Sequence, residues 1–371
     1  MALKYWVGGT GPWTGSGVLA SRVNWSNSSG GPTGAIAPGG ADDVRLDANS
    51  GVGTITISAT VQMRSIGATA YLGTLTGSGN MQITGSNTGL PQGSGKTIEF
   101  GPTGSPGLGM TYSYAGAITL SAGNGSGSIN LNGQTHGGNI QFNGAAGLWT
   151  LANPLVMTGT LTLSAGSFTT NNYNVTCSSI TVGIGALARS LSLGSSVVTL
   201  TNNASVWAFG TTSGVTLNAG TSTIIATNNS TNTITFAGGG LTYYNVEFAR
   251  ATGSGQITLT GSNTFFNFID NTSTAAHTIS FATSVSFTNT FQNFDVRGSS
   301  TSARITLSGG TAGANFIKST TGGIFCEYLN LGNNTTSVTP ANTWYAGYFS
   351  IGTGAGWVLQ PPSGLMLLGV G

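Results

Sequence analysis

The stretch that decides the fold is ITLSAG, residues 118–123, which recurs in variants along the chain. Ile118 and Leu120 alternate with Thr119, so the two apolar side chains share one face of a strand and the threonine takes the other. The serine and glycine that follow favour a turn. Six further segments share the pattern: LTLSAG from Leu161, VTLTNN from Val198, VTLNAG from Val215, ITFAGG from Ile234, ITLTGS from Ile257 and ITLSGG from Ile305.

The spacing of these segments indicates a repeat of about 20 residues. Their shortest steps are 17, 19 and 23 residues, and the longer steps are near twice that. One coil of a β-solenoid has this length, and stacking coils joins their apolar faces into one core. We therefore predict an all-β chain that forms a right-handed parallel β-helix or β-solenoid with small capping regions at both ends. A string of antiparallel β-sandwiches, with short strands at similar spacing, is the alternative.

Composition separates three regions. Residues 1–50 hold three tryptophans in a Gly- and Ser-rich stretch, residues 51–335 are a run of short strands, and residues 336–371 are rich in aromatic side chains. A parallel stack leaves unpaired strand edges at its two ends, and these edges need cover. We expect the first region to cap the stack or attach it to a neighbour, and the last region to be a cap or an interface.

The charge content excludes several classes of partner. Only 5% of the residues are charged, and the formal net charge is +2, whereas about 25% is usual in a globular domain. Because no basic run is present, we expect no nucleic-acid partner. No segment approaches the roughly 20 apolar residues of a membrane-spanning helix, so we expect no membrane insertion.

Candidate catalytic residues are scarce. Cleavage of a glycan needs two carboxylic acids on opposite sides of the scissile bond. Glu247 and Asp270 lie 23 residues apart, close to one coil, and are the only acids of the repeat region that could meet on adjacent coils. Isolated acids of this kind are more often surface or turn residues. We therefore predict no catalytic residue and no enzymatic activity.

One acidic cluster could attract a metal. Asp42, Asp43, Asp47 and Asn49 concentrate oxygen ligands of the kind that Ca²⁺ prefers within eight residues. Their spacing does not fit a calcium-binding loop, and a solvated acidic turn with a salt bridge to Arg45 explains them better. We predict no metal and no cofactor.

The histidines and cysteines are isolated in the sequence. His136 and His277 have no second ligand at zinc spacing, which indicates ordinary strand or turn residues. Cys177 and Cys326 lie in strand-like runs far apart, which indicates two buried reduced thiols.

The C-terminal region contains the candidate ligand or interface residues, which are Trp344, Tyr345, Tyr348 and Trp357. Aromatic rings can stack on sugar rings, which would suit a glycan or a host receptor. Tryptophan and tyrosine are also enriched in interface cores. We favour a cap or a subunit interface over a ligand site for this group.

Both ends of the chain resemble one group of proteins. The opening reads KYWVGGTG at residues 4–11 and ADDVRLDANSG at residues 41–51, and the end reads NTWYAG at residues 342–347 and GWVLQPP at residues 356–362. These segments resemble β-rich surface-appendage proteins of phages and bacteria, including virion proteins like tail fibres and spikes. The resemblance implies a β-rich virion or surface protein without catalytic residues.

The sequence therefore predicts a non-enzymatic structural component of a bacteriophage particle, a tail fibre or spike that takes part in host-surface adsorption. We expect a homotrimer, because fibres gain stability by burying one side against their copies, with other virion proteins and a host-surface glycan as partners. The opening residues lack the pattern of a secretory signal, so we expect synthesis in the host cytoplasm and assembly into the virion. The alternatives are a capsid decoration protein or head fibre, a polysaccharide-depolymerising tailspike, and a bacterial adhesin.

Overall fold

The structure is a computed structural model, and it describes residues 2–14, 24–86, 95–101, 109–121, 125–183, 187–210, 212–281, 285–310, 313–332, 336–347 and 349–360. These residues form short β-strands and one 3-10 helix, η2 (Ala48–Ser50), and contain no α-helix. The chain divides into two compact units. The first unit comprises residues 1–196 and 213–218, and the second comprises residues 197–212 and 219–371.

The strands of the first unit are β1 (Leu3–Trp6), β2 (Gly11–Pro12), β3 (Trp25–Ser26), β4 (Asp43–Arg45), β5 (Thr54–Ile57), β6 (Val61–Met63), β7 (Ser65–Ala68), β8 (Thr74–Gly77), β9 (Met81–Ile83), β10 (Lys96–Phe100), β11 (Thr111–Tyr114), β12 (Ile118–Leu120), β13 (Gly125–Asn130), β14 (Thr135–His136), β15 (Ile140–Leu151), β16 (Leu155–Met157), β17 (Thr160–Thr169), β18 (Val175–Cys177), β19 (Ser179–Val182), β20 (Arg189–Ser192) and β23 (Val215–Asn218).

The strands of the second unit are β21 (Val197–Leu200), β22 (Ser205–Phe209), β24 (Thr223–Ala226), β25 (Ile234–Ala237), β26 (Thr242–Phe248), β27 (Ile257–Thr260), β28 (Thr264–Asp270), β29 (His277–Ser280), β30 (Phe287–Arg297), β31 (Ile305–Ser308), β32 (Ala314–Lys318), β33 (Ile324–Glu327), β34 (Leu329–Asn330), β35 (Thr336–Thr339), β36 (Trp344–Ala346) and β37 (Trp357–Leu359).

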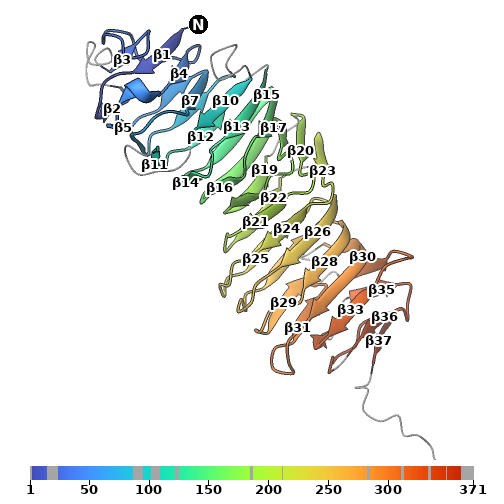
Figure 1. The fold of residues 1–371 in the computed structure, drawn as a ribbon. Coiled ribbons are helices and arrows are strands. Elements are labelled where there is room, and N and C mark those ends of the chain that lie inside the picture. Colours follow the sequence, from blue (N-terminus) through green and yellow to red (C-terminus); the bar gives the residue numbers. More distant parts are fainter. Residues whose placement is uncertain are drawn as a thin grey trace, which may run out of the picture. The chain divides into compact units, whose positions relative to one another are not determined.

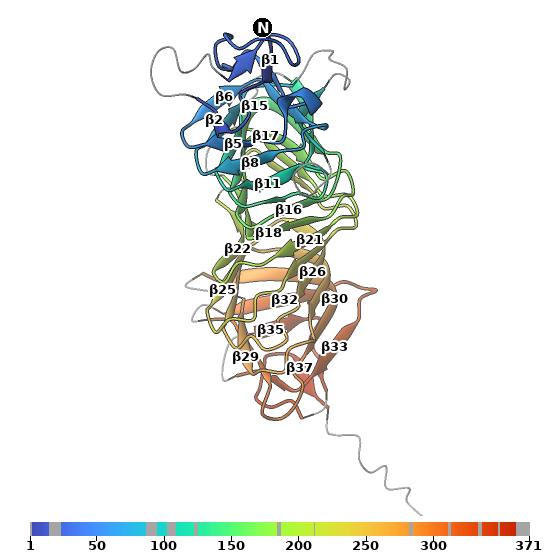
Figure 2. The same cartoon turned by 60° about the vertical axis from the view of Figure 1, so that its left-hand side comes forward.

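Parallel stacking of successive coils defines the first unit. In the ladder from β12 through β15 and β17 to β19, Ile118 faces Ile140, Ile140 faces Leu161, and Leu161 faces Ile180. All four side chains are buried, and each step advances the chain by about one 20-residue coil. Figure 1 shows these four strands in chain order along the stack, and Figure 2 shows β15 and β17 side by side from another direction. The predicted β-solenoid is therefore confirmed.

The second unit repeats this plan with larger core side chains. In the ladder from β26 through β28 to β30, Val246 faces Phe268 and Phe268 faces Phe294. The rings of Phe268 and Phe294 stack with centroids 5.5 Å apart, and both are fully buried. Within each unit the described strand pairs run parallel, apart from β1 with β3, which is incompatible with the sandwich alternative.

The repeat pattern predicts the positions of strands better than it predicts which of their side chains are buried. All seven predicted segments begin in or at a strand, from β12 to β31. In β23, however, Val215 and Leu217 are only half-buried, although alternation predicts them in the core. There β23 pairs with β20, whose side chains alternate between buried and half-buried positions.

Glycines occupy one corner where successive coils approach closely. A Cβ added to Gly116 would lie 1.9 Å from the carbonyl oxygen of Gly79, and one on Gly138 would lie 2.4 Å from that of Gly116. A Cβ on Gly159 would lie 2.2 Å from the carbonyl oxygen of Gly138. No side chain fits at such distances, so the stacking itself requires glycine at this corner.

Three tryptophans cap the first unit. Trp6, Trp13 and Trp25 are all buried, and the Trp25 ring lies 5.3 Å from Trp6 and 4.8 Å from Trp13, centroid to centroid. Trp25 Nε1 donates to the carbonyl oxygen of Trp13 at 3.0 Å, and Trp6 Nε1 donates to that of Gly9 at 2.9 Å. This cluster covers apolar surface that an end coil would otherwise expose.

Candidate functional site

Two of the predicted aromatic site residues lie in the core. Trp344 is fully buried and Trp357 is 9% exposed, and their ring centroids are 5.2 Å apart. Trp344 also contacts Phe294 and Phe316, with centroid distances of 5.6 and 5.8 Å. These tryptophans close the aromatic core of the second unit, and their rings offer no platform for a ligand.

The other two predicted residues have different outcomes. Tyr345 lies between buried Trp344 and buried Ala346 on β36, so alternation along the strand turns its ring outward, where it is 44% exposed. Tyr348 lies outside the described residues. Of the predicted group, Tyr345 is thus the described residue that can meet a ligand.

Tyr345 borders an amphipathic groove of about 280 Å³. Its lining combines aromatic, charged and amide side chains with a backbone floor, and consists of Arg297, Ile324, Phe325, Cys326, Glu327, Tyr345, Gly347 and Gln360. Phe325 is 56% exposed, and Gln360 is also exposed. Two exposed aromatic side chains beside charged and amide groups are typical of a site that orients a polar ligand over apolar surface.

The pairing of β30 with β33 determines where the charged side chains of this groove lie. On β30 and β33, Asp295 faces Phe325 and Arg297 faces Glu327. Buried Val296 and buried Cys326 lie between these positions, so alternation puts the four flanking side chains on the outer face.

The guanidinium of Arg297 is already engaged. Its Nε and Nη2 donate to Asp295 Oδ1 and Oδ2 at 2.6 and 2.9 Å, and Asn271 Nδ2 donates to Asp295 Oδ2 at 2.8 Å. The hydrogen bond to Asp295 raises the pKa of Arg297. Among the described residues no cation lies within ion-pair distance of Glu327. Glu327 is therefore the carboxylate of this groove that a ligand can use.

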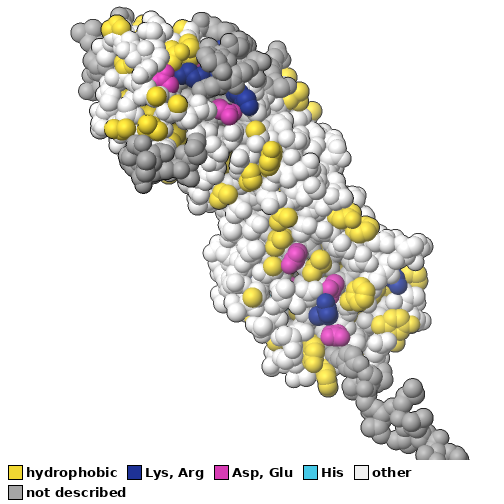
Figure 3. All heavy atoms as spheres, viewed as in Figure 1, with side chains coloured by type: hydrophobic (Ala, Val, Ile, Leu, Met, Phe, Trp, Pro, Cys, Tyr) yellow, Lys and Arg dark blue, Asp and Glu magenta, His cyan; other side chains and the backbone are white. Residues whose placement is uncertain are grey.

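Carboxylates outnumber cations on this outer face. Glu247 faces Ile269, and Ile269 faces Asp295, so Glu247 continues the outward row that contains Asp295. Burial, and then the negative charge of Asp270, raise the pKa of Glu247. Figure 3 shows acidic and basic side chains gathered beside hydrophobic ones over β26 to β33. The face carries three carboxylates, Glu247, Asp295 and Glu327, against the one guanidinium of Arg297.

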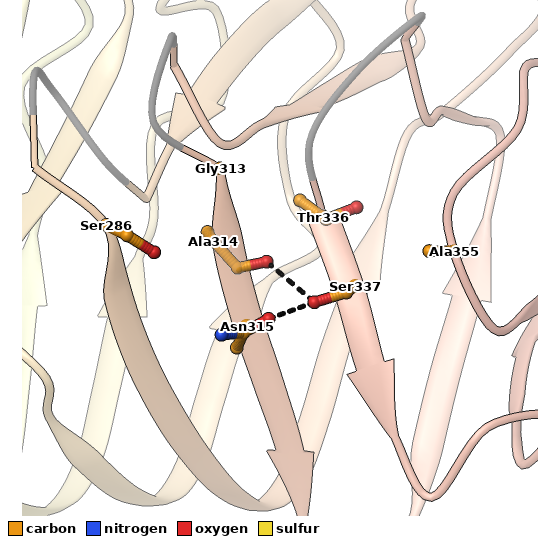
Figure 4. Close-up of a pocket in the computed structure, with 7 residues that line it drawn as sticks. All are labelled: Ser286, Gly313, Ala314, Asn315, Thr336, Ser337 and Ala355. Carbon is orange, nitrogen blue, oxygen red and sulfur yellow. Dashed lines mark hydrogen bonds between the residues drawn. The ribbon is translucent and has the colours of Figure 1, made fainter.

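A second depression in the same unit has different chemistry. It has a volume of about 300 Å³ and is lined by Ser286, Gly313, Ala314, Asn315, Thr336, Ser337 and Ala355 (Figure 4). The hydroxyl of Ser337 donates to Asn315 Oδ1 and lies 3.5 Å from the carbonyl oxygen of Ala314. Its lining includes no aromatic or charged side chain, so it offers less to a ligand than the groove beside Tyr345.

The acid pair considered for glycan cleavage lies on opposite faces of its sheet. Glu247 pairs with Ile269, so its side chain points outward, whereas Asp270 is the next residue along β28 and points into the core. Asp270 is fully buried, and its Oδ2 lies 2.8 Å from His277 Nε2. Burial raises the pKa of Asp270, although the hydrogen bond and charge of His277 oppose that shift. These two carboxyl groups cannot flank one substrate bond.

The acidic turn of the first unit is satisfied by protein groups. Asp43 forms a buried ion pair with Arg64 and accepts a hydrogen bond from Ser65. The predicted salt bridge to Arg45 is wrong, because Arg45 Nη1 instead donates to the carbonyl oxygen of Val44 at 2.7 Å.

Asp42 and Asp47 bind backbone amides. Asp42 accepts from the amides of Ala2 and Gly39, and Asp47 caps η2 by accepting from the amide of Asn49. Within the described part of the chain no three His, Cys, Asp or Glu side chains are grouped to hold a metal ion.

The isolated histidines and cysteines are buried strand residues. His136 lies in β14, where a hydrogen bond of 2.9 Å joins its Nδ1 to Tyr112 Oη. His277 lies in β29 beside Asp270. Cys177 and Cys326 are buried thiols that form no disulfide, as predicted.

The groove contains residues that we did not single out from the sequence, namely Phe325, Glu327, Arg297 and Gln360. The run IFCE, residues 324–327, carried a usable signal. Alternation around a buried Cys326 places Phe325 and Glu327 together on the opposite face. Their proximity to Arg297 and Tyr345 depends on strand register, which alternation does not give.

Comparisons with protein-family models, with curated proteins and with solved structures found no match. In the part of the chain that the structure describes, no helix has the length and apolar character needed to cross a membrane.

Proposed function

We propose that this protein is a non-enzymatic structural component of a bacteriophage appendage, of the tail-fibre or spike kind, that takes part in adsorption to the host surface. The observation that carries the proposal is the parallel stack of coils in each unit, with its continuous apolar core. Each coil is hydrogen-bonded through its strands to the coils on either side, which suits a stiff spacer. The terminal segments that resemble phage appendage proteins add support.

The surface chemistry also supports an exposed scaffold. The outward positions of the second unit carry a ladder of amides, in which Asn267 donates to Asn245 Oδ1 at 2.6 Å and accepts from Asn293 Nδ2 at 2.7 Å. This row of amides is polar and uncharged, and its own hydrogen bonds lock it. The stacking of coils explains the regularity of this row without an enzymatic role.

The hydrogen bonds of Asp295 favour binding over hydrolysis at the groove, because hydrolysis needs a second available carboxyl group beside Glu327. Both oxygens of Asp295 accept hydrogen bonds from Arg297 and Asn271. A general acid or nucleophile must instead present a free oxygen to the scissile bond. We therefore include the groove in the proposal as an adhesive site.

Competition for adsorption tests the proposal. Purified protein in excess should slow the adsorption of phage particles that carry this gene to their host cells, and heat-unfolded protein should not. An unchanged adsorption rate at saturating protein would refute the role in host adsorption. Light scattering on the same sample should give a mass of about three times 37.2 kDa if the chain is the proposed homotrimer.

A further inference from the structure

We infer that the groove between Phe325 and Tyr345 binds a carbohydrate that carries no acidic group, an inference that rests on the proposed adsorption function. Phe325 and Tyr345 come from neighbouring parts of the second unit, on β33 and β36, and line the same depression. The case depends on three features: the exposed rings, the polar groups beside them, and the sign of the local charge.

The two rings are unusual in this molecule because they are exposed. Most described phenylalanines and tryptophans are buried, including the core neighbours Phe294 and Trp344. Phe325 and Tyr345 instead expose 56% and 44% of their surface. A sugar ring has one face lined with C–H groups, and an aromatic ring packs against that face with its electron-rich surface.

Polar groups border the same opening and can bind the hydroxyl groups at the edge of a sugar ring. The floor between them is Gly347, which is held to β33 by a 2.7 Å hydrogen bond from its amide to the carbonyl oxygen of Cys326. A Cβ at Gly347 would lie 3.8 Å from Glu327 Cγ and 3.9 Å from Gln360 Oε1. The Glu327 side chain and the amide oxygen of Gln360 therefore both lie beside Gly347, where they can accept hydrogen bonds from the hydroxyl or ammonium groups of a sugar.

The charge of the surroundings selects the kind of sugar. Arg297 would be the natural partner of an acidic sugar, but Asp295 already holds it through two hydrogen bonds. Glu327 and the outward carboxylate of Glu247 add further negative charge to the same outer face, on which carboxylates outnumber the one guanidinium. An anionic saccharide would therefore be repelled, whereas a neutral or amine-bearing one would not.

An array of bacterial surface saccharides, with acidic and non-acidic members, tests the inference on the full-length protein. We expect signals from non-acidic members. Phe325→Ala and Tyr345→Ala should each weaken binding by about tenfold, as expected for loss of an aromatic contact. Glu327→Lys should move the preference toward acidic members. Phe266→Ala is the matched control, because Phe266 is 40% exposed on the same unit but stacks on Tyr244 outside the groove.

Three results would overturn the assignment: no signal above that of the Phe325→Ala/Tyr345→Ala double variant, binding dominated by acidic members, or equal loss in Phe266→Ala. Thermal unfolding of each variant separates loss of binding from loss of the fold. The proposed function can fail separately. If the protein binds saccharides but does not compete for adsorption, the groove assignment stands and the adsorption role is refuted. If it competes for adsorption but binds no saccharide, only the groove assignment is refuted.

Discussion

Acid should lower the free energy of unfolding of the first unit, because it protonates the buried side chain of His136. Burial lowers the pKa of His136 from 6.5 to about 4, although a hydrogen bond to the carbonyl oxygen of Asn139 partly opposes the shift. At pH values between these two pKa values, the folded state therefore binds fewer protons than the unfolded state. The stabilising contribution is fully present above pH 6.5 and is lost as the pH falls toward 4. Between pH 7.5 and pH 4.5 the free energy of unfolding should fall by about 2.5 kcal/mol.

Guanidinium-induced unfolding of the wild type and of His136→Phe at these two pH values measures the effect. The variant leaves Tyr112 Oη without its partner, which lowers stability equally at both pH values because Tyr112 does not titrate there. Asp270 and His277 act in the opposite direction, since both pKa values are raised in the folded state, but they contribute equally to both proteins. The same pH dependence in wild type and variant would refute the assignment to His136.

Three further substitutions test the packing. Phe294→Ala should lower the stability of the second unit by about 3–5 kcal/mol, because the ring is fully buried among other rings, and thermal unfolding should show the loss. Asp43→Asn should cost about 3–5 kcal/mol by leaving the buried Arg64 without its carboxylate; an Asp43→Asn/Arg64→Met double variant that recovers no stability in denaturant titration would contradict this. Asn267→Ala should cost about 1–3 kcal/mol, because it breaks the amide ladder on both sides, and hydrogen exchange at β26 and β30 should be faster than in the wild type.

The coil architecture could be predicted because its determinants are local. Alternation in Ile118-Thr119-Leu120 gives the buried face, and the spacing of its copies gives the coil length, which the ladder from Ile118 to Ile140 confirms. The glycine content could be linked to turns in general. The reason why Gly138 must be a glycine is its close contact with the carbonyl oxygen of Gly116 in the preceding coil, and this contact exists only when coils are stacked.

The sites could be predicted less well because they depend on register. Glu247 and Asp270 are 23 residues apart, which is near one coil, but the ladder pairs Glu247 with Ile269. A difference of one residue moves a side chain to the other face of a strand. In the same way, the sequence offered Arg45 as the partner of Asp43, and coil stacking brought Arg64 instead.

The aromatic residues of the C-terminal segment differ in whether their side chains are buried or exposed. The sequence grouped Trp344, Tyr345 and Trp357 by residue type. The strand pairing of β36 with β37 sends both tryptophans inward together and leaves Tyr345 outside. A cap and a candidate binding residue are therefore parts of the same short strand.

The most direct test of the proposed role is electron cryo-microscopy of intact particles, with this chain located in the density. The account predicts stacked parallel coils in an appendage that projects from the particle, with the groove of Phe325 and Tyr345 open to solvent. Coils of this chain lying within the capsid shell, or a particle that lacks the chain, would contradict it.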